Sequence, residues 1–180
     1  MKNIILLFII SFFVGCSEKK ETSDEILNKE IKSLLKFGDN DNEVILISKP
    51  TDIEEYCIEV LKKDTINFTS FEIQQILEQI EKPIVSDWSV FNFDNVKILD
   101  YKVWLDLFRG DLEKGWKVFQ KEHGSRYLEI SSPIFLKNYS YCLVFSHSHC
   151  GSNCGGGSFI LYKKINGKWE ISKQYCNFMS

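Results

Sequence analysis

The 180-residue chain lacks both a basic cluster and an apolar run long enough to span a membrane. Its 22 Lys and Arg are outnumbered by 25 Asp and Glu and are spread along the chain, which argues against a nucleic-acid-binding surface. The longest apolar run extends from Ile4 to Gly15 and is interrupted at Ser11. A transmembrane helix needs roughly 20 apolar residues, so this run is too short. There is no internal repeat and no low-complexity segment.

Histidine is scarce, which limits the acid–base chemistry open to the chain. His123, His147 and His149 are the three histidines, and none belongs to a recognisable set of nucleophile, base and orienting group. Asp106 and Asp111 are acidic residues five positions apart, a pattern typical of a solvated surface. The sequence therefore predicts no catalytic residue, no cofactor and no enzymatic activity.

The N-terminus has the pattern of an export signal. A short basic start precedes the apolar run, and the run ends in "FFVGC", with a small residue directly before Cys16. This stretch resembles the lipobox of bacterial lipoproteins, in which the cysteine is acylated and becomes the new N-terminus. The resemblance implies a signal peptide at 1–15 and a lipidated Cys16 that begins a flexible polar tether at 16–24. The alternative is ordinary secretion with cleavage near Gly15.

An acylated cysteine would hold the protein on a membrane without crossing it, because several acyl chains make a stable anchor. Ser17 follows Cys16, whereas an aspartate there holds the best-studied lipoproteins on the inner membrane. The resemblance thus implies the outer membrane of a bacterial cell envelope, on either its periplasmic or its external side. The expected partners are the membrane and an unidentified envelope protein or ligand, with no nucleic acid.

Residues 25–180 are sufficient for one domain with its own core. Helical periodicity gives way to strand patterns near Gly124, which predicts an α+β fold with N-terminal helices packed on a C-terminal antiparallel β-meander. Helices are expected at 24–37, at 51–63 with Thr51 as the cap, between Thr69 and Pro83 with a Thr69–Glu72 capping box, and at 112–123. Strands are expected at 43–48, 94–100, 126–131, 139–148, 158–164 and 168–176.

The dipeptide Asn166-Gly167 predicts a type I′ hairpin turn, since both central positions of that turn need a positive φ. A two-residue loop fixes the register, so Tyr162 is expected to face Ile171. On this register the side of Tyr162 is expected to be buried and the side of Lys163 solvated. Continued along the strands, the same register places Cys176 opposite Gly157.

The stretch "SHSHCGSNCGGGSF" at 146–159 concentrates potential metal ligands and glycines. It is expected to join a strand ending near Ser146 to one beginning near Ser158. Glycine-rich phosphate loops lead into a helix, whereas this stretch leads into a strand of β-branched and aromatic residues. A phosphate site is therefore disfavoured.

A metal site is the principal alternative for this stretch. His147 and His149 are two residues apart, so both point to one side of a strand and can ligate zinc or copper. Cys150 and Cys154 are the possible remaining ligands, although Cys150 lies on the strand side opposite the histidines. The alternative function is a metal-handling envelope protein that uses the two histidines and a cysteine.

The favoured interpretation is a disulfide between Cys150 and Cys154. Export exposes the pair to an oxidising compartment, and the intervening Gly-Ser-Asn turns easily. Oxidised cysteines do not bind metals, because thiolates are the ligands, so the histidine pair is expected to bind no metal. Gly155 and Gly157 are expected as turn residues that allow a positive φ or a close backbone approach.

Five cysteines remain besides Cys16, so at least one of them is free. Cys57 lies on the apolar side of its predicted helix and is expected to be a core residue. The hairpin register makes a bond between Cys154 and Cys176 the competing pairing. The partners of three cysteines stay open: Cys57, Cys142 and Cys176.

The C-terminal part of the chain combines "SSPIF" at Ser131–Phe135 with a Cys-Gly-x-x-Cys-Gly-x-Gly loop and a Lys-x-x-Gly-x-Trp hairpin. This pattern resembles a group of small uncharacterised envelope lipoproteins from Bacteroidota, over about residues 112–180. The residues that carry it are Cys150, Gly151, Cys154, Gly155, Gly157, Gly167, Trp169 and Ser180, with Trp116 upstream. The resemblance implies location and fold. The expected function is that of a membrane-anchored binding or interaction module with a disulfide-tied β-hairpin end.

Replacing Cys16 tests the anchor. Cys16→Ala removes the thiol that would carry the acyl chains, so we expect an unlipidated precursor and no mature protein in the detergent-extracted membrane fraction. Cell fractionation and intact-mass measurement check both points against the unchanged chain. Normal membrane partitioning of the variant would contradict the lipobox interpretation.

Overall fold

The computed structural model describes residues 22–35 and 43–179. The described ranges leave out the predicted signal peptide, Cys16 and the rest of the predicted tether up to residue 21, and the end of the first predicted helix. In the described ranges, none of the helices has the length and apolar character needed to cross a bilayer.

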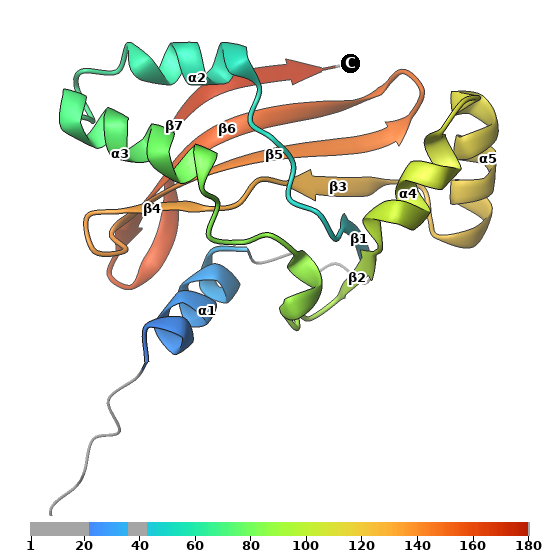
Figure 1. Cartoon of the computed structure of the whole chain (residues 1–180), viewed down its shortest axis with the longest axis horizontal. Helices are drawn as coiled ribbons and strands as arrows, with labels where there is room; N and C mark the ends of the chain where they lie inside the picture. Colours follow the sequence, from blue (N-terminus) through green and yellow to red (C-terminus); the bar gives the residue numbers. More distant parts are fainter. Residues whose placement is uncertain (1–21, 36–42, 180) are drawn as a thin grey trace, which may run out of the picture.

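Helices and strands follow the predicted order, with all of the described helices before the meander (Figure 1). The helices are α1 (Ser23–Leu34), α2 (Glu55–Lys62), α3 (Ser70–Glu81), the 3₁₀ turn η1 (Trp88–Val90), α4 (Tyr101–Phe108) and α5 (Leu112–Glu122). The strands are β1 (Val44–Ile47), β2 (Val96–Leu99), β3 (Tyr127–Ile130), β4 (Ile134–Leu136), β5 (Tyr141–Gly151), β6 (Cys154–Ile165) and β7 (Lys168–Met179). The α+β class with a C-terminal antiparallel meander is confirmed.

All described strands belong to one seven-stranded mixed sheet in the order β2-β1-β3-β5-β6-β7, with β4 also beside β5. β5, β6 and β7 form the antiparallel meander, whereas β1 is parallel to both β2 and β3. Parallel neighbours need a long crossover, and α2 and α3 lie in the one between β1 and β2. The strands β1, β2 and β3 therefore add to the β5 edge of the C-terminal meander and form one sheet with it.

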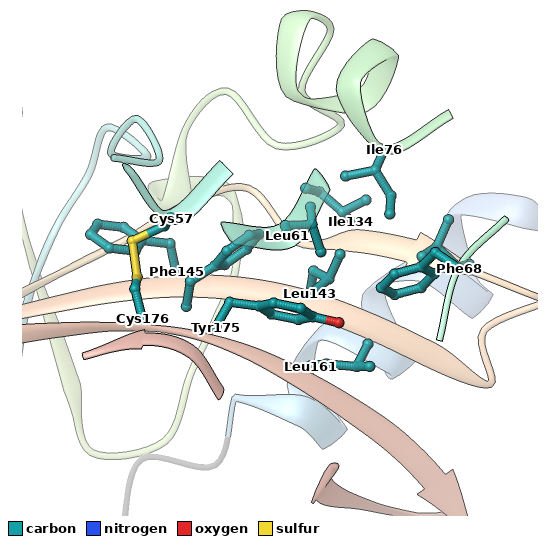
Figure 2. Close-up of a cluster of buried hydrophobic side chains, with 12 residues drawn as sticks. Cys57, Leu61, Phe68, Ile76, Ile134, Leu143, Phe145, Leu161, Tyr175 and Cys176 are labelled. Atoms are coloured by element: carbon teal, nitrogen blue, oxygen red, sulfur yellow. A yellow bond between two sulfur atoms is a disulfide. The ribbon is translucent and has the colours of Figure 1, made fainter. Parts of the chain in front are cut away.

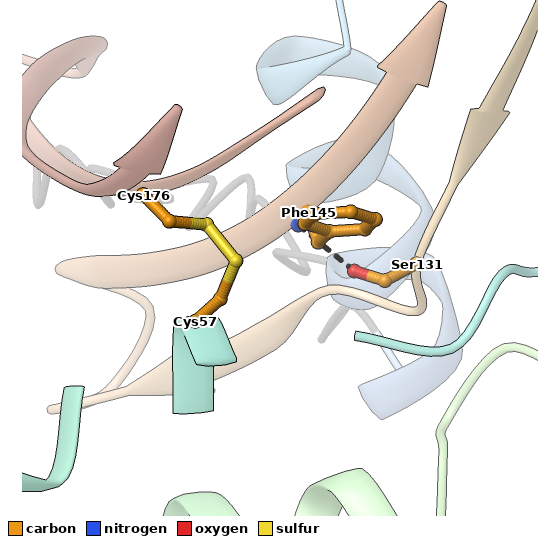
Figure 3. The surroundings of a disulfide bond; sticks show 4 residues. All are labelled: Cys57, Ser131, Phe145 and Cys176. Carbon is orange, nitrogen blue, oxygen red and sulfur yellow. Dashed lines mark hydrogen bonds between the residues drawn. A yellow bond between two sulfur atoms is a disulfide. The ribbon is translucent and has the colours of Figure 1, made fainter. Parts of the chain in front are cut away.

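β3 and β4 share one edge of β5, separated by the short segment Ser131-Ser132-Pro133. Ser131 joins the two halves, because its N–H donates to the Phe145 carbonyl at 2.9 Å and its Oγ accepts from the Phe145 N–H at 3.0 Å (Figure 3). Pro133 fits this break between the strands, since proline has no N–H to donate to a neighbouring strand. The break thus leaves no gap in the pairing of β5 at Phe145.

Helices cover both faces of the sheet, so successive residues of β5 enter different cores. Leu143 and Phe145 point toward α2 and α3, whereas Cys142 and Val144 point toward α1. We call the first cluster the α2–α3 core (Figure 2). Its buried members are Cys57, Leu61, Phe68, Ile76, Ile134, Leu136, Leu143, Phe145, Phe159, Leu161, Tyr175 and Cys176.

Helices α4 and α5 lie at the other end of the sheet from α2 and α3 (Figure 1), and a second cluster on the same face packs against them. We call it the α4–α5 core; its buried members are Ile45, Ile47, Leu99, Trp116, Phe119 and Tyr127. Trp116 and Phe119 occupy the buried side of α5, as their spacing predicts. The face therefore carries two separate apolar clusters, one under each pair of helices.

α1 packs on the opposite face and is joined to the β6–β7 hairpin by polar contacts. Glu30 forms an ion pair with Lys164, and the Trp169 Nε1–H donates to Ser33 Oγ at 3.0 Å. Ile31 is fully buried in the same contact. The side chain of Lys164 therefore lies on the α1 side of the sheet.

The Asn166-Gly167 turn has positive φ values of 51° and 78°, and Tyr162 pairs with Ile171 as predicted. The prediction fails further along, because two bulges each add one residue to β7. Cys176 therefore lies opposite Phe159 instead of Gly157.

The predicted division of the hairpin into a buried and a solvated face is also wrong. Leu161 and Phe159, on the side assigned to solvent, are fully buried in the α2–α3 core. Ile171, on the side assigned to the core, is 66% exposed. The prediction assumed that one face of the hairpin is covered and the other solvated, whereas helices cover both faces of the sheet.

Helix boundaries agree with the sequence patterns at α3 and α5 and differ at α2. The capping box at Thr69 and Glu72 is present, and Asp111 caps α5 by accepting from the Lys114 N–H. α2 begins four residues after Thr51, whose N–H donates to the Ile130 carbonyl and holds the chain extended beside the sheet. α4 and the three-residue η1 were not predicted.

A buried disulfide between Cys57 and Cys176 links α2 to β7 across 119 positions of sequence (Figure 3). Cys57 is a core residue, as predicted, and this bond resolves its pairing. Of the described cysteines, Cys142 is the free one; burial raises the pKa of its thiol, so it stays protonated.

A buried carboxylate strengthens the same junction. Asp64, with 2% of its side chain exposed, accepts from the Tyr175 hydroxyl at 2.6 Å, from Lys173 at 3.0 Å and from Asn67. Burial alone raises the pKa of Asp64, but the hydrogen bonds from Tyr175, Asn67 and Lys173 outweigh it and lower the pKa. The ionised carboxylate therefore joins the end of α2 to β7.

The Cys57–Cys176 bond and a second disulfide, between Cys150 and Cys154 in the β5–β6 hairpin, should contribute unequally to stability. Loop-entropy reasoning gives about 5 kcal/mol for a loop the size of that closed by Cys57 and Cys176, and about 2 kcal/mol for a five-residue loop. Urea unfolding of the alanine double variants should show the larger loss of unfolding free energy for Cys57→Ala with Cys176→Ala, relative to Cys150→Ala with Cys154→Ala. Equal losses would contradict this assignment.

Asp64→Asn should change how stability depends on pH. A lowered pKa in the folded state means that the stabilisation is present above about pH 4, the range in which unfolded Asp ionises, and is lost as the pH falls. Unfolding free energies should differ most between wild type and variant at neutral pH, and the difference should narrow below about pH 4. A difference that does not change with pH would exclude the ionised carboxylate as the cause.

Candidate metal centre

The histidine- and glycine-rich stretch lies within the β5–β6 ladder. β5 continues to Gly151 and β6 begins at Cys154, so the turn is limited to Ser152 and Asn153. The expectation that the strands end near Ser146 and begin near Ser158 is therefore wrong. The glycines of β6 continue the pairing, with Gly155, Gly156 and Gly157 opposite His149, Ser148 and His147.

Cys150 and Cys154, the predicted pair, are joined as a disulfide at the tip of this hairpin. The competing bond between Cys154 and Cys176 is not formed. Because disulfide sulfurs are not thiolate ligands, the alternative set of His147, His149, Cys150 and Cys154 is wrong in its two cysteines.

The predicted turn glycines serve another purpose. Gly155 and Gly157 lie in β6 without positive φ values. A Cβ on Gly157 would lie 2.5 Å from the ring of Phe178, so this position needs glycine for close approach. Of the two predicted roles, a positive φ and a close backbone approach, Gly157 serves the second.

His147 and His149 point to the same side of β5, as their spacing predicts. Their ring centroids are 3.8 Å apart. The third histidine, His123, caps the end of α5 and lies against Phe119. Asp111 is occupied as the cap at the start of that helix, so neither residue joins the histidine pair.

Glu129 completes a group of three potential ligands from the neighbouring strand. It pairs directly with His147 across the β3–β5 ladder, and its Oε2 lies 2.8 Å from His149 Nε2. The side chains of Glu129 and His149 are 15% and 22% exposed, respectively. Sequence analysis missed Glu129, although it shares its side of the strand with the buried Tyr127.

The Nε2 atoms of the two histidines make no hydrogen bond with the described part of the protein. In both His147 and His149 this atom is buried. The Glu129 Oε2 atom thus lies within ion-pair distance of His149 Nε2, at 2.8 Å, but the two atoms do not have the geometry of a hydrogen bond. Burying polar nitrogens without partners costs free energy, and a bound cation would remove that cost.

The buried position of His147 lowers its pKa and favours the neutral imidazole. Burial lowers the pKa of His147, and the charge of His149 lowers it further, whereas Glu129 and Glu54 act in the opposite direction. A neutral imidazole is the form that binds metals.

Aromatic side chains hold the two rings on either side. Tyr127 stacks on His149 with centroids 4.6 Å apart, and Phe178 meets His147 edge-on at 5.1 Å. Burial raises the pKa of Tyr127 to about 12, so its phenol is protonated at neutral pH. The two histidine rings thus lie between Phe178, which packs against the α2–α3 core, and Tyr127 of the α4–α5 core, and this packing fixes their positions.

Glu129, His147 and His149 each offer one ligand atom, and these atoms lie within 4.8 Å of one another. Ligands around tetrahedral Zn²⁺ are about 3.4 Å apart for bonds of about 2.0–2.1 Å, so small side-chain rotations suffice to bind an ion. Two imidazoles and one carboxylate suit Zn²⁺, Fe²⁺, Ni²⁺ or Cu²⁺ better than Ca²⁺ or Mg²⁺, which prefer all-oxygen sites.

No family model matches the chain, and neither a curated protein nor a solved structure matches it significantly.

Proposed function

We propose that the protein is a lipid-anchored envelope protein that binds a divalent transition-metal ion through Glu129, His147 and His149. The convergence of three ligand atoms around buried nitrogens that lack hydrogen-bond partners is the observation that supports it most strongly. The expectation of a metal-free histidine pair assumed that cysteines were needed as the other ligands. Glu129 supplies a third ligand without them.

The anchor at Cys16 and the envelope location form part of the same proposal. Two disulfides among the described cysteines fit a chain that matures in an oxidising compartment. The lipobox-like "FFVGC" and the resemblance to Bacteroidota envelope lipoproteins support attachment to a membrane of the envelope, and Ser17 in place of an aspartate supports the outer membrane. We propose a binding role for the domain and not an enzymatic one.

Zinc titration of the purified, detergent-solubilised full chain tests the metal site. We expect one equivalent to bind wild type, and the affinity to fall by about 100-fold or more in Glu129→Gln, His147→Ala and His149→Ala, because each loses a ligand. His123→Ala is the matched control and should bind like wild type. Calorimetry measures the affinity, and circular dichroism without metal verifies folding.

Two results would contradict the site: no saturable binding of Zn²⁺, Co²⁺ or Cu²⁺ by wild type, or equal binding by all variants. The titration should also depend on pH, since imidazole ligands must be neutral. Affinity should decrease as the pH falls below about 6, where ordinary histidines become protonated.

A further inference from the structure

The two disulfides of the described chain differ in their access to solvent. Cys57 and Cys176 are 0% and 6% exposed and belong to the α2–α3 core. Cys154 is exposed, and its partner Cys150 is partly exposed. Thiol–disulfide exchange requires a thiolate to reach a sulfur atom, so its rate depends on access. A reducing thiol can therefore approach the bond between Cys150 and Cys154, whereas the core shields the other bond.

The accessible bond lies at a tip that projects beyond the neighbouring strands. β3 accompanies β5 as far as His149, which pairs with Tyr127. On the other side, Met179 is the last described residue of β7, and it pairs with Gly156 of β6. Residues 150–155 thus form a two-stranded extension of the described sheet (Figure 1). Because isolated two-stranded ladders are marginally stable in water, the disulfide is the main restraint on this extension.

Cys150 is an additional residue in β5, immediately after His149. The ladder pairs His149 with Gly155 and then Gly151 with Cys154. Cys150 therefore has no partner in β6 and forms a β-bulge, a feature that changes the direction of neighbouring side chains. The disulfide, and not strand pairing, holds Cys150 in place, so the bond restrains the residue that directly follows His149.

His149 has one firm and one weak neighbour across the sheet. Tyr127 of β3 pairs with it and stacks on its ring at 4.6 Å. The residue opposite in β6 is Gly155, which has no side chain to pack against the imidazole. Breaking the disulfide thus loosens the β6 side of His149 and leaves its contact with Tyr127 intact.

We infer that the Cys150–Cys154 bond is a thiol–disulfide exchange site, and that its oxidised form holds His149 for metal binding. The second part of this inference rests on the proposed metal-binding function. The reductant is a dithiol, one of whose thiolates attacks Sγ of Cys154, forms a mixed disulfide and releases Cys150 as a thiolate that takes up a proton. The second thiol of the reductant then displaces Cys154, so two electrons and two protons pass to the protein and the dithiol leaves as a disulfide.

Graded reduction of the purified full chain, without metal, tests the exchange site. Dithiothreitol is added under native conditions for a fixed time, new thiols are blocked with iodoacetamide, and peptide mapping locates the label. The Cys150–Cys154 bond should open at a dithiothreitol concentration about 10-fold lower than the bond in the α2–α3 core, because access limits exchange. In the control, the chain unfolded in urea, both bonds should open at similar concentrations. Opening of both bonds at the same concentration in the folded chain would overturn the exchange site.

Serine variants test the link to the metal centre without adding new thiolate ligands. Cys150→Ser combined with Cys154→Ser should bind Zn²⁺ about 10-fold more weakly than oxidised wild type, because a less preorganised ligand binds less tightly. Ser152→Ala, at the same tip, keeps the disulfide and should stay within about twofold of wild type. In a His149→Ala background the serine pair should cause little additional loss, since the restraint acts through that ligand.

The outcomes separate this inference from the proposed function. If the serine pair binds Zn²⁺ like wild type while His149→Ala is defective, the metal site stands and the control by the disulfide is overturned. Equal losses with and without His149 would indicate a general effect on folding and overturn that control as well. Absence of Zn²⁺ binding by wild type would overturn the proposed function together with its link to the disulfide, and the labelling experiment then decides the exchange site by itself.

Discussion

The pairing of β3 with β5 is the constraint on which the arrangement of the candidate centre depends. It places Glu129 opposite His147 and Tyr127 opposite His149, so a carboxylate and an aromatic ring come to the two histidines from one neighbouring strand. A shift of one residue would turn these side chains to the α1 side of the sheet. Ser131 protects the register, because its backbone and side chain both bond to Phe145 where β3 ends.

The two apolar cores on this face make the site rigid. Tyr127 belongs to the α4–α5 core, and Phe178 packs against the α2–α3 core. The histidine rings lie between them, so their orientations are determined by packing on both sides. Such preorganisation reduces the ordering cost of binding an ion. The same packing keeps water from the Nε2 atoms, which explains why buried nitrogens persist there without hydrogen-bond partners.

Local signals in the sequence were sufficient for the parts of the fold that depend on neighbouring residues. The capping box at Thr69, the turn at Asn166-Gly167 and the shared side of the two histidines all follow from spacings of a few positions. The start of α2 could not be predicted, because a hydrogen bond from Thr51 to Ile130, far along the chain, holds that segment extended. Glu129 was missed for the same reason: its approach to the histidines requires the register between two strands. The bond between Cys57 and Cys176 likewise depends on tertiary packing, since sequence alone gives no pairing.

The bulges of β7 connect the glycines of the hairpin to the metal centre. Each bulge adds one residue to β7, so Phe178 occupies the place opposite Gly157 that an uninterrupted ladder would give to Cys176. This shift brings Cys176 opposite Phe159, where it bonds to Cys57 and fixes α2. It also lays the Phe178 ring over Gly157, where a Cβ would collide with it, and against His147. Glycine is therefore needed at position 157 because the Phe178 ring lies over it, and the same displacement of β7 positions both that ring and, through the disulfide, helix α2.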